Sequence, residues 1–331
     1  MTSLIDVQNL TIQFRTDEGL ITAVEDVSFS LKKGEVMGLV GESGSGKSVT
    51  AKALMQLNAG NAVYAPQSRV MLDAESGPVD VMTLRTPREH KVVRGGSISM
   101  IFQEPMASFA PAITIGKQMV EQLQLHSDMS KAQAKALSVE MLDRVGISDA
   151  SRRFDQYAFE LSGGMRQRAM IAMALSTKPR LLIADEPTTA LDVTIQAQVI
   201  DLMKDLVNEF QMGIIFITHD LGVVAQTADK VCVMYLGRLV EEGSVREVIR
   251  NPKHPYTRGL LTALPRLDDL DAPLTPVPGD IPSPLERPDG CVFSTRCAEV
   301  VGEVCSTRVP LEEWVDPTHR VACHLYQKDG R

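Results

Sequence analysis

The stretch Gly41-Glu42-Ser43-Gly44-Ser45-Gly46-Lys47-Ser48 fits G-x-x-x-x-G-K-[ST], the pattern of a loop that holds phosphate groups. An apolar run over 36–40 precedes it and predicts a buried strand, and residues 48–57 predict a helix. Glycines let backbone N–H groups turn toward phosphate oxygens, and the start of a helix carries partial positive charge. We therefore expect a nucleoside triphosphate site, in which Lys47 reaches the β- and γ-phosphates and Ser48 holds Mg²⁺. The nucleotide-binding residues would be Gly41, Ser43, Gly44, Ser45, Gly46, Lys47, Ser48 and Val49. The alternative is a glycine-rich turn that binds nothing.

Composition excludes several classes of protein. The chain has 331 residues, enough for one large domain or two, and its hydrophobic content of 44% is ordinary for a globular protein. A net charge of −8 argues against a broad nucleic-acid-binding surface. No apolar run approaches the ~18 residues needed to cross a bilayer, and the N-terminus lacks the pattern of a signal peptide. We expect a cytosolic protein whose membrane role depends on partner subunits.

Apolar runs and helical periodicity alternate along the chain. This order predicts an α/β fold with a largely parallel sheet. Residues 59–97 are irregular and polar, and we expect antiparallel strands and loops there. Strands are expected over 4–14, 22–31, 97–102, 181–186 and 214–219, helices within 113–146, 161–176 and 195–210, and a hairpin over 230–242.

From about residue 251 the composition changes. Seven prolines between Pro265 and Pro288 predict an extended, wrapping segment rather than regular structure. Four of the five cysteines lie in the last 41 residues, and a reducing cytosol disfavours disulfides between them. The fifth, Cys232, sits in an apolar strand and is expected to be inert core.

Two acids, Asp185 and Glu186, end the apolar run over 181–186. Ligands bind at the carboxyl ends of parallel strands. Asp185 is expected to hold Mg²⁺ through water, and Glu186 to act as the general base for an attacking water. The alternative is that both acids cap the next helix.

A second candidate anion site lies at Leu161-Ser162-Gly163-Gly164-Met165. Ser162 can cap a helix, and the two glycines expose backbone N–H groups. Two phosphate half-sites and one nucleotide pocket in a chain make sense if two copies meet head to tail. The alternative is an ordinary helix cap.

Together these motifs resemble the nucleotide-binding subunit of an ABC transporter, over about residues 4–245. The matching motifs are Walker A at Gly41–Ser48, the Q-loop glutamine Gln103, the signature at 161–167, Walker B at 181–186, the D-loop at Ala190-Leu191-Asp192 and the switch histidine His219. The resemblance implies an ABC-type P-loop NTPase: a mixed, largely parallel sheet core with an antiparallel β subdomain and a helical insertion.

The resemblance also implies roles for single residues. Glu186, His219 and Gln103 would be catalytic, and Mg²⁺ would be held through Ser48, Gln103 and Asp185. His219 would contact the γ-phosphate and the attacking water, although a core histidine at a strand end is the alternative. Gln103 would relay to a transmembrane partner through the helical insertion. The signature of a second subunit would act in trans through Ser162, Gly163, Gly164, Gln167 and Asp192.

Adenine is expected to stack on an aromatic side chain near the N-terminus, and Phe14 is the candidate. Phe14 shares a strand face with Ile12, so a core position is the alternative.

Further segments narrow the resemblance to oligopeptide/dipeptide importer ATPases, nearly end to end. These segments are 23–29, 102–106, 185–194, His254-Pro255-Tyr256-Thr257, Gly290-Cys291-Val292-Phe293 and Arg296-Cys297. The resemblance implies an ATPase that drives uptake of di- or oligopeptides from the cytoplasmic face of the bacterial inner membrane. Its partners would be a second ATPase subunit, two permease subunits and an extracytoplasmic solute-binding protein, with no nucleic acid.

One departure is Ser108-Phe109-Ala110-Pro111, where peptide importers have Ser-Leu-Asn-Pro. An oligosaccharide or another small solute is therefore the alternative cargo. From another class, a non-transport ABC ATPase is the rival, but the chain is acidic and has no long coiled coil or second ATPase half.

The cysteine spacing is Cys291-x5-Cys297-x7-Cys305-x17-Cys323, without the tight pairs of structural zinc sites. It resembles members of the dipeptide-type subfamily that bind a 4Fe-4S cluster through four thiolates. Zinc and unligated cysteines are the alternatives. We expect a nucleotide-binding domain over 1–250, with a helical subdomain at about 104–165, and an oligopeptide-transporter-type extension with this four-Cys motif over 251–331.

Overall fold

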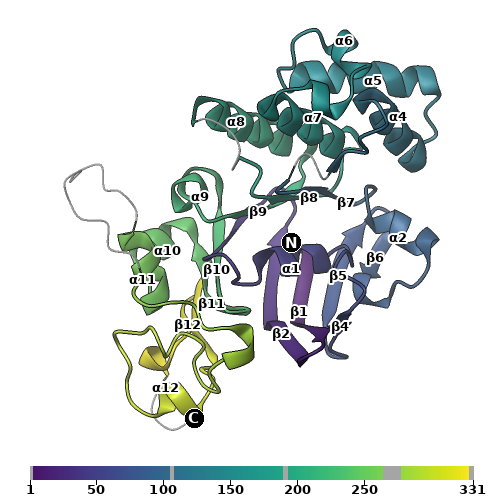
Figure 1. Cartoon of the computed structure of the whole chain (residues 1–331). Helices are drawn as coiled ribbons and strands as arrows, with labels where there is room; N and C mark the ends of the chain where they lie inside the picture. Colours follow the sequence, from purple (N-terminus) through teal and green to yellow (C-terminus); the bar gives the residue numbers. More distant parts are fainter. Residues whose placement is uncertain (1–2, 105–107, 189–192, 264–276, 328–331) are drawn as a thin grey trace. The chain divides into compact units, whose positions relative to one another are not determined.

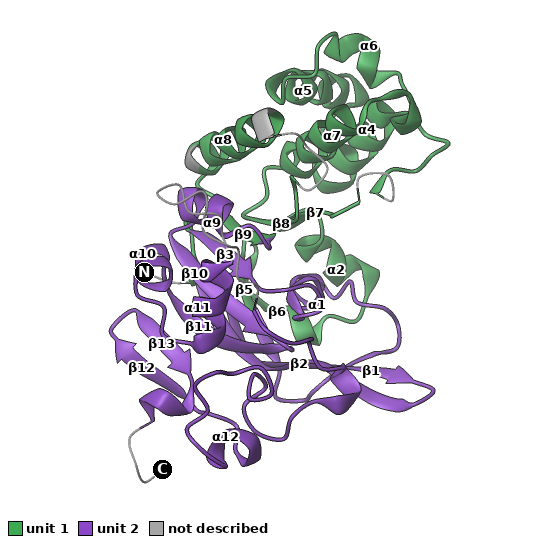
Figure 2. Cartoon of the chain, turned by 60° about the vertical axis from the view of Figure 1, so that its left-hand side comes forward, with its two compact units in different colours: residues 1–5, 31–35, 71–217 green, residues 6–30, 36–70, 218–331 purple. Residues whose placement is uncertain are grey.

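The computed structural model describes residues 3–104, 108–188, 193–263 and 277–327 (Figure 1). The chain folds into two compact units, each assembled from separate segments of sequence (Figure 2). Unit 1 comprises residues 1–5, 31–35 and 71–217, and unit 2 comprises 6–30, 36–70 and 218–331.

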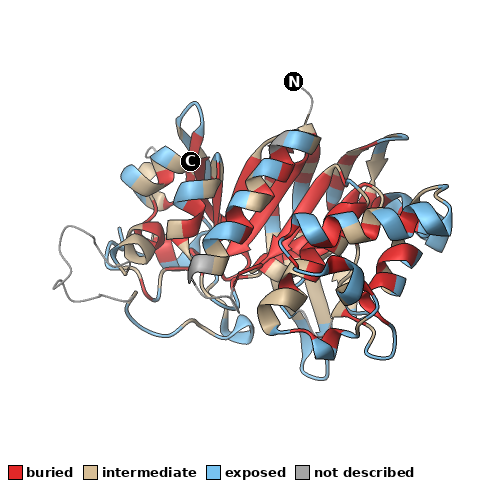
Figure 3. Ribbon diagram, turned by 90° about the horizontal axis from the view of Figure 1, so that it is seen from above, coloured by how far each residue is buried: buried red, intermediate tan, exposed pale blue. Residues whose placement is uncertain are grey.

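Unit 1 is built on three buried strands that run parallel. β7 (Ile98–Ile101) pairs with β8 (Leu181–Asp185), and β8 pairs with β9 (Gly213–Thr218), whose last residue belongs to unit 2. All three are buried along their whole length, as the continuous apolar runs predict (Figure 3). Because the strands are parallel, the residues that follow β7 and β8 emerge at the same edge of the sheet.

Helices of unit 1 form a cluster in which α4, α5, α6 and α7 pack on one another, and α7 also contacts β7. The periodicity over 113–146 resolves into two helices. The chain breaks between them because Ser130 opens the second helix with a capping box to Gln133. Gly146 follows the second helix with φ of +75°, the left-handed conformation in which a glycine commonly ends a helix. The bounds are α4 (Ile115–His126), α5 (Lys131–Arg144), α6 (Ala150–Phe154), η2 (Ala158–Glu160), α7 (Gly163–Ser176) and α8 (Val193–Phe210).

Residues 59–97 contain the predicted antiparallel strands and one helix that was not expected. β5 (Arg69–Ala74) and β6 (Gly77–Asp80) are antiparallel, and η1 (Val81–Thr83) follows. The unexpected helix is α2 (Pro87–Val93). Its signals were present in the sequence: Thr86 and Glu89 form a capping box, and Pro87 occupies the first helical position.

Unit 2 holds a mixed sheet. β3 (Val36–Val40) pairs in parallel with β10 (Lys230–Tyr235), which forms the predicted hairpin with β11 (Arg238–Ser244). In a second, separate sheet, β1 (Ser3–Thr16) pairs with β2 (Gly19–Lys32) and with β4 (Ala62–Tyr64). The helices are α1 (Lys47–Ala53), α9 (Leu221–Thr227), α10 (Val245–Arg250), α11 (Pro255–Thr262) and α12 (Val304–Thr307), with η3 (Pro284–Glu286) and η4 (His324–Tyr326).

The last part of the chain contains regular elements on both sides of its proline-rich stretch. α11 follows His254, and β12 (Glu312–Asp316) and β13 (His319–Ala322) form a hairpin. β13 pairs with β11, so the last part of the chain adds strands to the sheet that contains β3. This pairing was not predicted, because local composition does not reveal strand pairing over about 80 residues. In the predicted extended stretch, the described residues 277–288 contain only the short η3.

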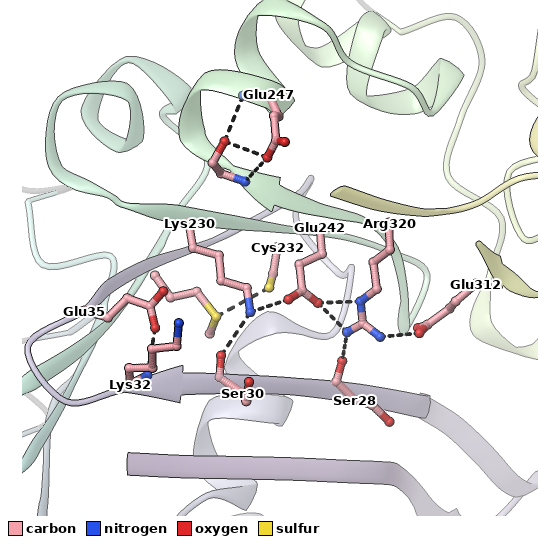
Figure 4. A network of polar contacts seen from close by, with 12 residues as sticks. Ser28, Ser30, Lys32, Glu35, Lys230, Cys232, Glu242, Glu247, Glu312 and Arg320 are labelled. Atoms are coloured by element: carbon pink, nitrogen blue, oxygen red, sulfur yellow. Dashed lines mark hydrogen bonds and ion pairs between the residues drawn. The ribbon is translucent and has the colours of Figure 1, made fainter. Parts of the chain in front are cut away.

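A network of charged side chains around the buried Glu242 accompanies this added hairpin (Figure 4). The Glu242 carboxylate on β11 pairs with Lys230 of β10 and accepts from Arg320 Nε of β13 at 2.7 Å. Arg320 also pairs with Glu312 on β12, and Lys230 Nζ donates to Ser30 O at 3.0 Å. Buried charges are tolerated only when paired and hydrogen-bonded, and each of these groups meets that condition. Cys232 is fully buried on β10, which confirms it as core.

Among the helices that the structure describes, none combines the length and apolar character needed to cross a bilayer.

Candidate nucleotide site

The phosphate loop connects β3 to α1 in unit 2, in the strand–loop–helix context that its pattern requires. At two positions in this loop a glycine is required, because the loop backbone lies close to the backbone of another segment. A Cβ on Gly41 would lie 2.2 Å from Met234 O, and one on Gly46, whose φ is +98°, would lie 2.9 Å from Ala23 O. Any other residue at these positions would force the loop apart, so both glycines shape it.

Lys47 opens α1, and its ammonium group is turned back over the loop. Its Nζ donates to Gly41 O at 2.7 Å, Glu42 O at 2.8 Å and Ser45 Oγ at 3.3 Å, with the residue 6% exposed. These contacts place a buried positive charge at the loop that Ser43, Gly44, Ser48 and Val49 complete. The structure therefore brings the predicted phosphate-binding residues into one loop.

Glu42, at a variable position of the pattern, is held by two residues from far along the chain. Its backbone N–H donates to Tyr256 Oη at 2.8 Å, and its carboxylate accepts from Arg296 Nη1 at 2.8 Å and Nη2 at 3.2 Å. Arg296 also donates to Pro278 O and Val277 O. Sequence reasoning missed this support, although Tyr256 and Arg296 lie in two segments that carried the importer resemblance.

An aromatic cluster surrounds that support. The ring of Tyr235 lies 4.7 Å from that of Tyr256 and 5.2 Å from that of Phe293, measured between centroids. Burial raises the pKa of both tyrosine hydroxyls, so they stay neutral hydrogen-bonding groups. The Arg296 side chain is only 4% exposed beside this cluster, and it pairs there with the Glu42 carboxylate.

In unit 1 the structure brings together two of the predicted catalytic residues. Gln103 follows β7 and Glu186 follows β8, and Gln103 Nε2 donates to Glu186 Oε2 at 2.9 Å. Glu186 has φ of +46°, an uncommon backbone conformation for a residue with a Cβ. Its N–H donates to Ile217 O at 2.9 Å, which holds that conformation. Such strained residues gather at functional sites. Asp185, the last residue of β8, is buried.

The signature stretch begins α7 in unit 1. Ser162 is its N-cap and accepts from Met165 N–H at 3.3 Å. Ser162 itself is exposed, and no atom lies within 4 Å of where a Cβ on Gly163 would stand, so this helix start is accessible beside Gly164. Gln167 is buried and donates to Pro187 O, which links the signature helix to the residue after Glu186.

Neither His219 nor Phe14, both in unit 2, is a fully buried core residue, which was the alternative to each predicted role. His219 follows β9 and is exposed, so it is not a core histidine. Asp220 beside it caps α9 by accepting from Gly222 N–H at 2.8 Å. Phe14 is half-buried at the pair with Ala62, whereas Ile12 on the same strand is fully buried. The predicted Asp192 lies outside the described residues.

The four tail cysteines of unit 2 surround one small cavity. Cys291, Cys297, Cys305 and Cys323 all line it, and none is in a disulfide. Burial raises the pKa of Cys291 to about 11 and that of Cys323 to about 12. Without a bound cation these buried thiols stay protonated, because nothing compensates the charge of a thiolate there.

Comparison with known proteins places this geometry in a family. The ABC transporter family model matches residues 24–189, and the model of the oligopeptide/dipeptide transporter C-terminal region matches residues 240–305. Two similar proteins are the oligopeptide transport ATP-binding proteins OppD of Salmonella typhimurium and Escherichia coli. Each is 49% identical to this chain, across 97% of this chain and 93% of its own length.

Solved structures agree with the fold. The dimeric post-hydrolysis state of the ATP-binding cassette MJ0796 bound to ADP and Pi covers 73% of this chain and 99% of its own. Its TM-score is 0.65 and its identity 25%. A second dimeric structure of the MJ0796 bacterial ABC transporter cassette has a TM-score of 0.64, an identity of 26% and the same coverage. The chain therefore belongs to the ABC transporter family, with an ABC-type P-loop NTPase fold and the oligopeptide/dipeptide transporter C-terminal region.

Proposed function

We propose that this chain is the ATP-hydrolysing subunit of an ABC importer that takes up di- and oligopeptides. The near full-length similarity to two oligopeptide transport ATP-binding proteins supports the cargo class. The single observation that carries hydrolysis is the hydrogen bond from Gln103 Nε2 to the carboxylate of Glu186, at the ends of two neighbouring parallel strands.

The phosphate loop binds ATP. Its backbone N–H groups and Lys47 contact the phosphates, and the half-buried Phe14 stacks on adenine. The Ser48 hydroxyl, the Gln103 amide oxygen and the Asp185 carboxylate are the hard oxygen donors that Mg²⁺ takes. Mg²⁺, when bound, neutralises charge on the β- and γ-phosphates.

Hydrolysis needs a base and an aligned water. Glu186 accepts a proton from the water as its oxygen attacks the γ-phosphorus, and the bond from that phosphorus to the bridging oxygen breaks, so ADP and phosphate leave. Gln103 fixes the direction of the Glu186 carboxylate, and His219 contacts the γ-phosphate. Positioning supplies most of the rate enhancement, so catalysis depends on the fixed backbone conformation of Glu186 as well as on the charge of its carboxylate.

The signature serves a second ATPase subunit. The exposed Ser162 and the open space at Gly163 leave amide donors available to a phosphate from outside the chain, and Gly164, Gln167 and Asp192 complete the set. Two sandwiched ATP molecules would close such a dimer, and hydrolysis would open it. Two permease subunits and a solute-binding protein complete the importer, with this chain peripheral at the cytoplasmic face of the inner membrane.

We assign residues 1–250 to nucleotide binding, with the helical subdomain at about 104–165, and residues 251–331 to the extension. The extension's Cys291, Cys297, Cys305 and Cys323 would hold a 4Fe-4S cluster. Four thiols around one cavity fit such a cluster as donors.

Zinc is the alternative occupant of the same four thiolates, with Zn–S bonds of about 2.3 Å in a tetrahedral site.

Replacing Glu186 by Gln tests the base. The variant should keep ATP binding, lose hydrolysis by at least about 100-fold and accumulate as an ATP-bound dimer, because Gln cannot take the proton. ATP turnover and size-exclusion chromatography measure this, with the exposed Glu121→Gln as control. Turnover retained in Glu186→Gln would contradict the assignment.

The cluster is tested in anaerobically purified full-length protein. We expect about four iron and four sulfide per chain and broad visible absorbance, which Cys297→Ser should abolish. Cys297 is the least buried of the four, so this variant disturbs folding least. Cys232→Ala, outside the cavity, is the control. Protein that contains no iron would end the cluster proposal.

A further inference from the structure

The C-terminal hairpin of unit 2 carries a second group of metal-ligand types, which no motif marked. Asp316 ends β12, His319 begins β13, and Glu247 lies on α10. One ring nitrogen of His319 and one carboxylate oxygen of each acid lie within 4.8 Å of one another. None of these residues lines the cysteine cavity.

His319 is fully buried, and its two ring nitrogens differ. Nε2 lies 2.7 Å from Glu241 Oε1, while Nδ1 has no hydrogen-bond partner among the residues that the structure describes. A buried polar atom without a hydrogen-bond partner is costly, so the unpartnered Nδ1 points to a ligand at this position. Because Nε2 is taken by Glu241, Nδ1 is the nitrogen left for the two acids.

Glu241 decides which nitrogen of a neutral ring carries the proton. Its carboxylate accepts from Lys253 N–H at 2.7 Å and from His254 N–H at 2.9 Å as well as facing His319. Burial acts to raise the pKa of Glu241, but the hydrogen bonds from His319 and these two amides outweigh it and lower the pKa. The Glu241 carboxylate accepts a hydrogen bond from Nε2–H, which leaves the lone pair of the ring on Nδ1.

A histidine that donates one N–H to a carboxylate and offers its other nitrogen is the arrangement in which proteins hold metals. We propose that His319 Nδ1, Glu247 and Asp316 bind a divalent transition-metal ion, of the class that accepts imidazole and carboxylate together, such as zinc or cobalt. Two carboxylates balance the charge of the ion, and the exposed Asp316 leaves room for water as a further ligand. The ion ties the hairpin turn to α10, where Thr318 Oγ1 already donates to Glu247 Oε1 at 2.8 Å.

Cobalt titration of the full-length chain without nucleotide tests this proposal. Co²⁺ bound by thiolates has strong charge-transfer absorption, whereas Co²⁺ bound by imidazole and carboxylate has only weak bands. Equilibrium dialysis should count bound cobalt beyond the thiolate fraction. Asp316→Asn should weaken this second class by at least about tenfold and leave the thiolate absorption unchanged.

Two further variants keep the result interpretable. His319→Gln would disturb a buried residue, so Glu247→Gln is the second probe: it retains the side-chain oxygen that caps α10 and should lose cobalt to a similar degree. Glu313→Gln, on the same strand, is the control and should bind as the unaltered chain does. Equal cobalt binding by Asp316→Asn and the unaltered chain, or no cobalt beyond the thiolate fraction, overturns the proposal.

Discussion

The phosphate loop of unit 2 and the Gln103–Glu186 pair of unit 1 are stabilised in opposite ways. The loop is supported from outside itself: Arg296 and Tyr256, more than 200 residues away in sequence, hold Glu42. Glu186 instead has a strained backbone whose N–H donates to Ile217 O, and its carboxylate accepts an exposed hydrogen bond from Gln103. The anion-binding loop is thus stabilised by a large buried network, whereas the bond between the proposed base and Gln103 is exposed to solvent.

This difference predicts different kinetic signatures. Changes at the loop support should alter protein stability and ATP binding together, because the loop must be formed before ATP binds. Changes at the Gln103–Glu186 pair should alter turnover while stability stays nearly constant, because the hydrogen bond that joins them is exposed. Three substitutions test the contrast, from the largest effect on stability to the smallest.

Arg296→Met should have the largest effect. It leaves the Glu42 carboxylate beside a buried aromatic cluster without its partner, at a cost of about 3 kcal/mol. The apparent Kd for ATP should rise at least about tenfold. Chemical denaturation and nucleotide titration measure both effects. Arg258→Met, which removes a half-exposed pair with Glu299, is the matched control and should cost less than about 1 kcal/mol. Equal losses in the two variants would mean that the loop is not supported by Arg296.

Tyr256→Phe should have an intermediate effect. It removes only the hydroxyl that accepts from Glu42 N–H and keeps the ring contacts, so about 1 kcal/mol of the free energy of unfolding should be lost. Thermal unfolding with and without ATP gives the measurement. A variant as stable as the unaltered chain, with unchanged ATP affinity, would show that this hydrogen bond does not shape the loop.

Gln103→Ala should change stability least. Its hydrogen bond to Glu186 is exposed, so the free energy of unfolding should fall by no more than about 0.5 kcal/mol. The kcat for ATP should fall by about 10- to 100-fold with little change in KM, because the carboxylate loses its orientation. A change confined to KM would argue for a binding role instead.

Local patterns in the sequence accounted for much of the fold and the site. The phosphate loop, the parallel strands β7, β8 and β9 and the β10–β11 hairpin rest on short-range signals: glycine spacing, continuous apolar runs and turn residues. The capping box at Thr86 was an equally local signal, but it was overlooked, and α2 was therefore not predicted.

Contacts between distant segments were not predictable in the same way. Three such contacts join segments about 70 to 250 positions apart. β13 pairs with β11, Arg296 donates to the Glu42 carboxylate, and Glu247 lies close to Asp316 and His319. No periodicity records such a pairing, because each partner satisfies its own local preference whichever segment it meets.

The sequence alone determined the identity of the phosphate loop, the acids that end β8 and the cysteines of the tail, since these depend on residue type and short spacing. The tertiary structure alone decided which side chains support that loop, that Glu186 adopts a left-handed backbone beside Gln103, and that His319 keeps Nδ1 unpartnered toward two carboxylates. The physical reason is that burial and hydrogen-bond partners are properties of the packed chain, in which segments remote in sequence compete for the same buried polar groups.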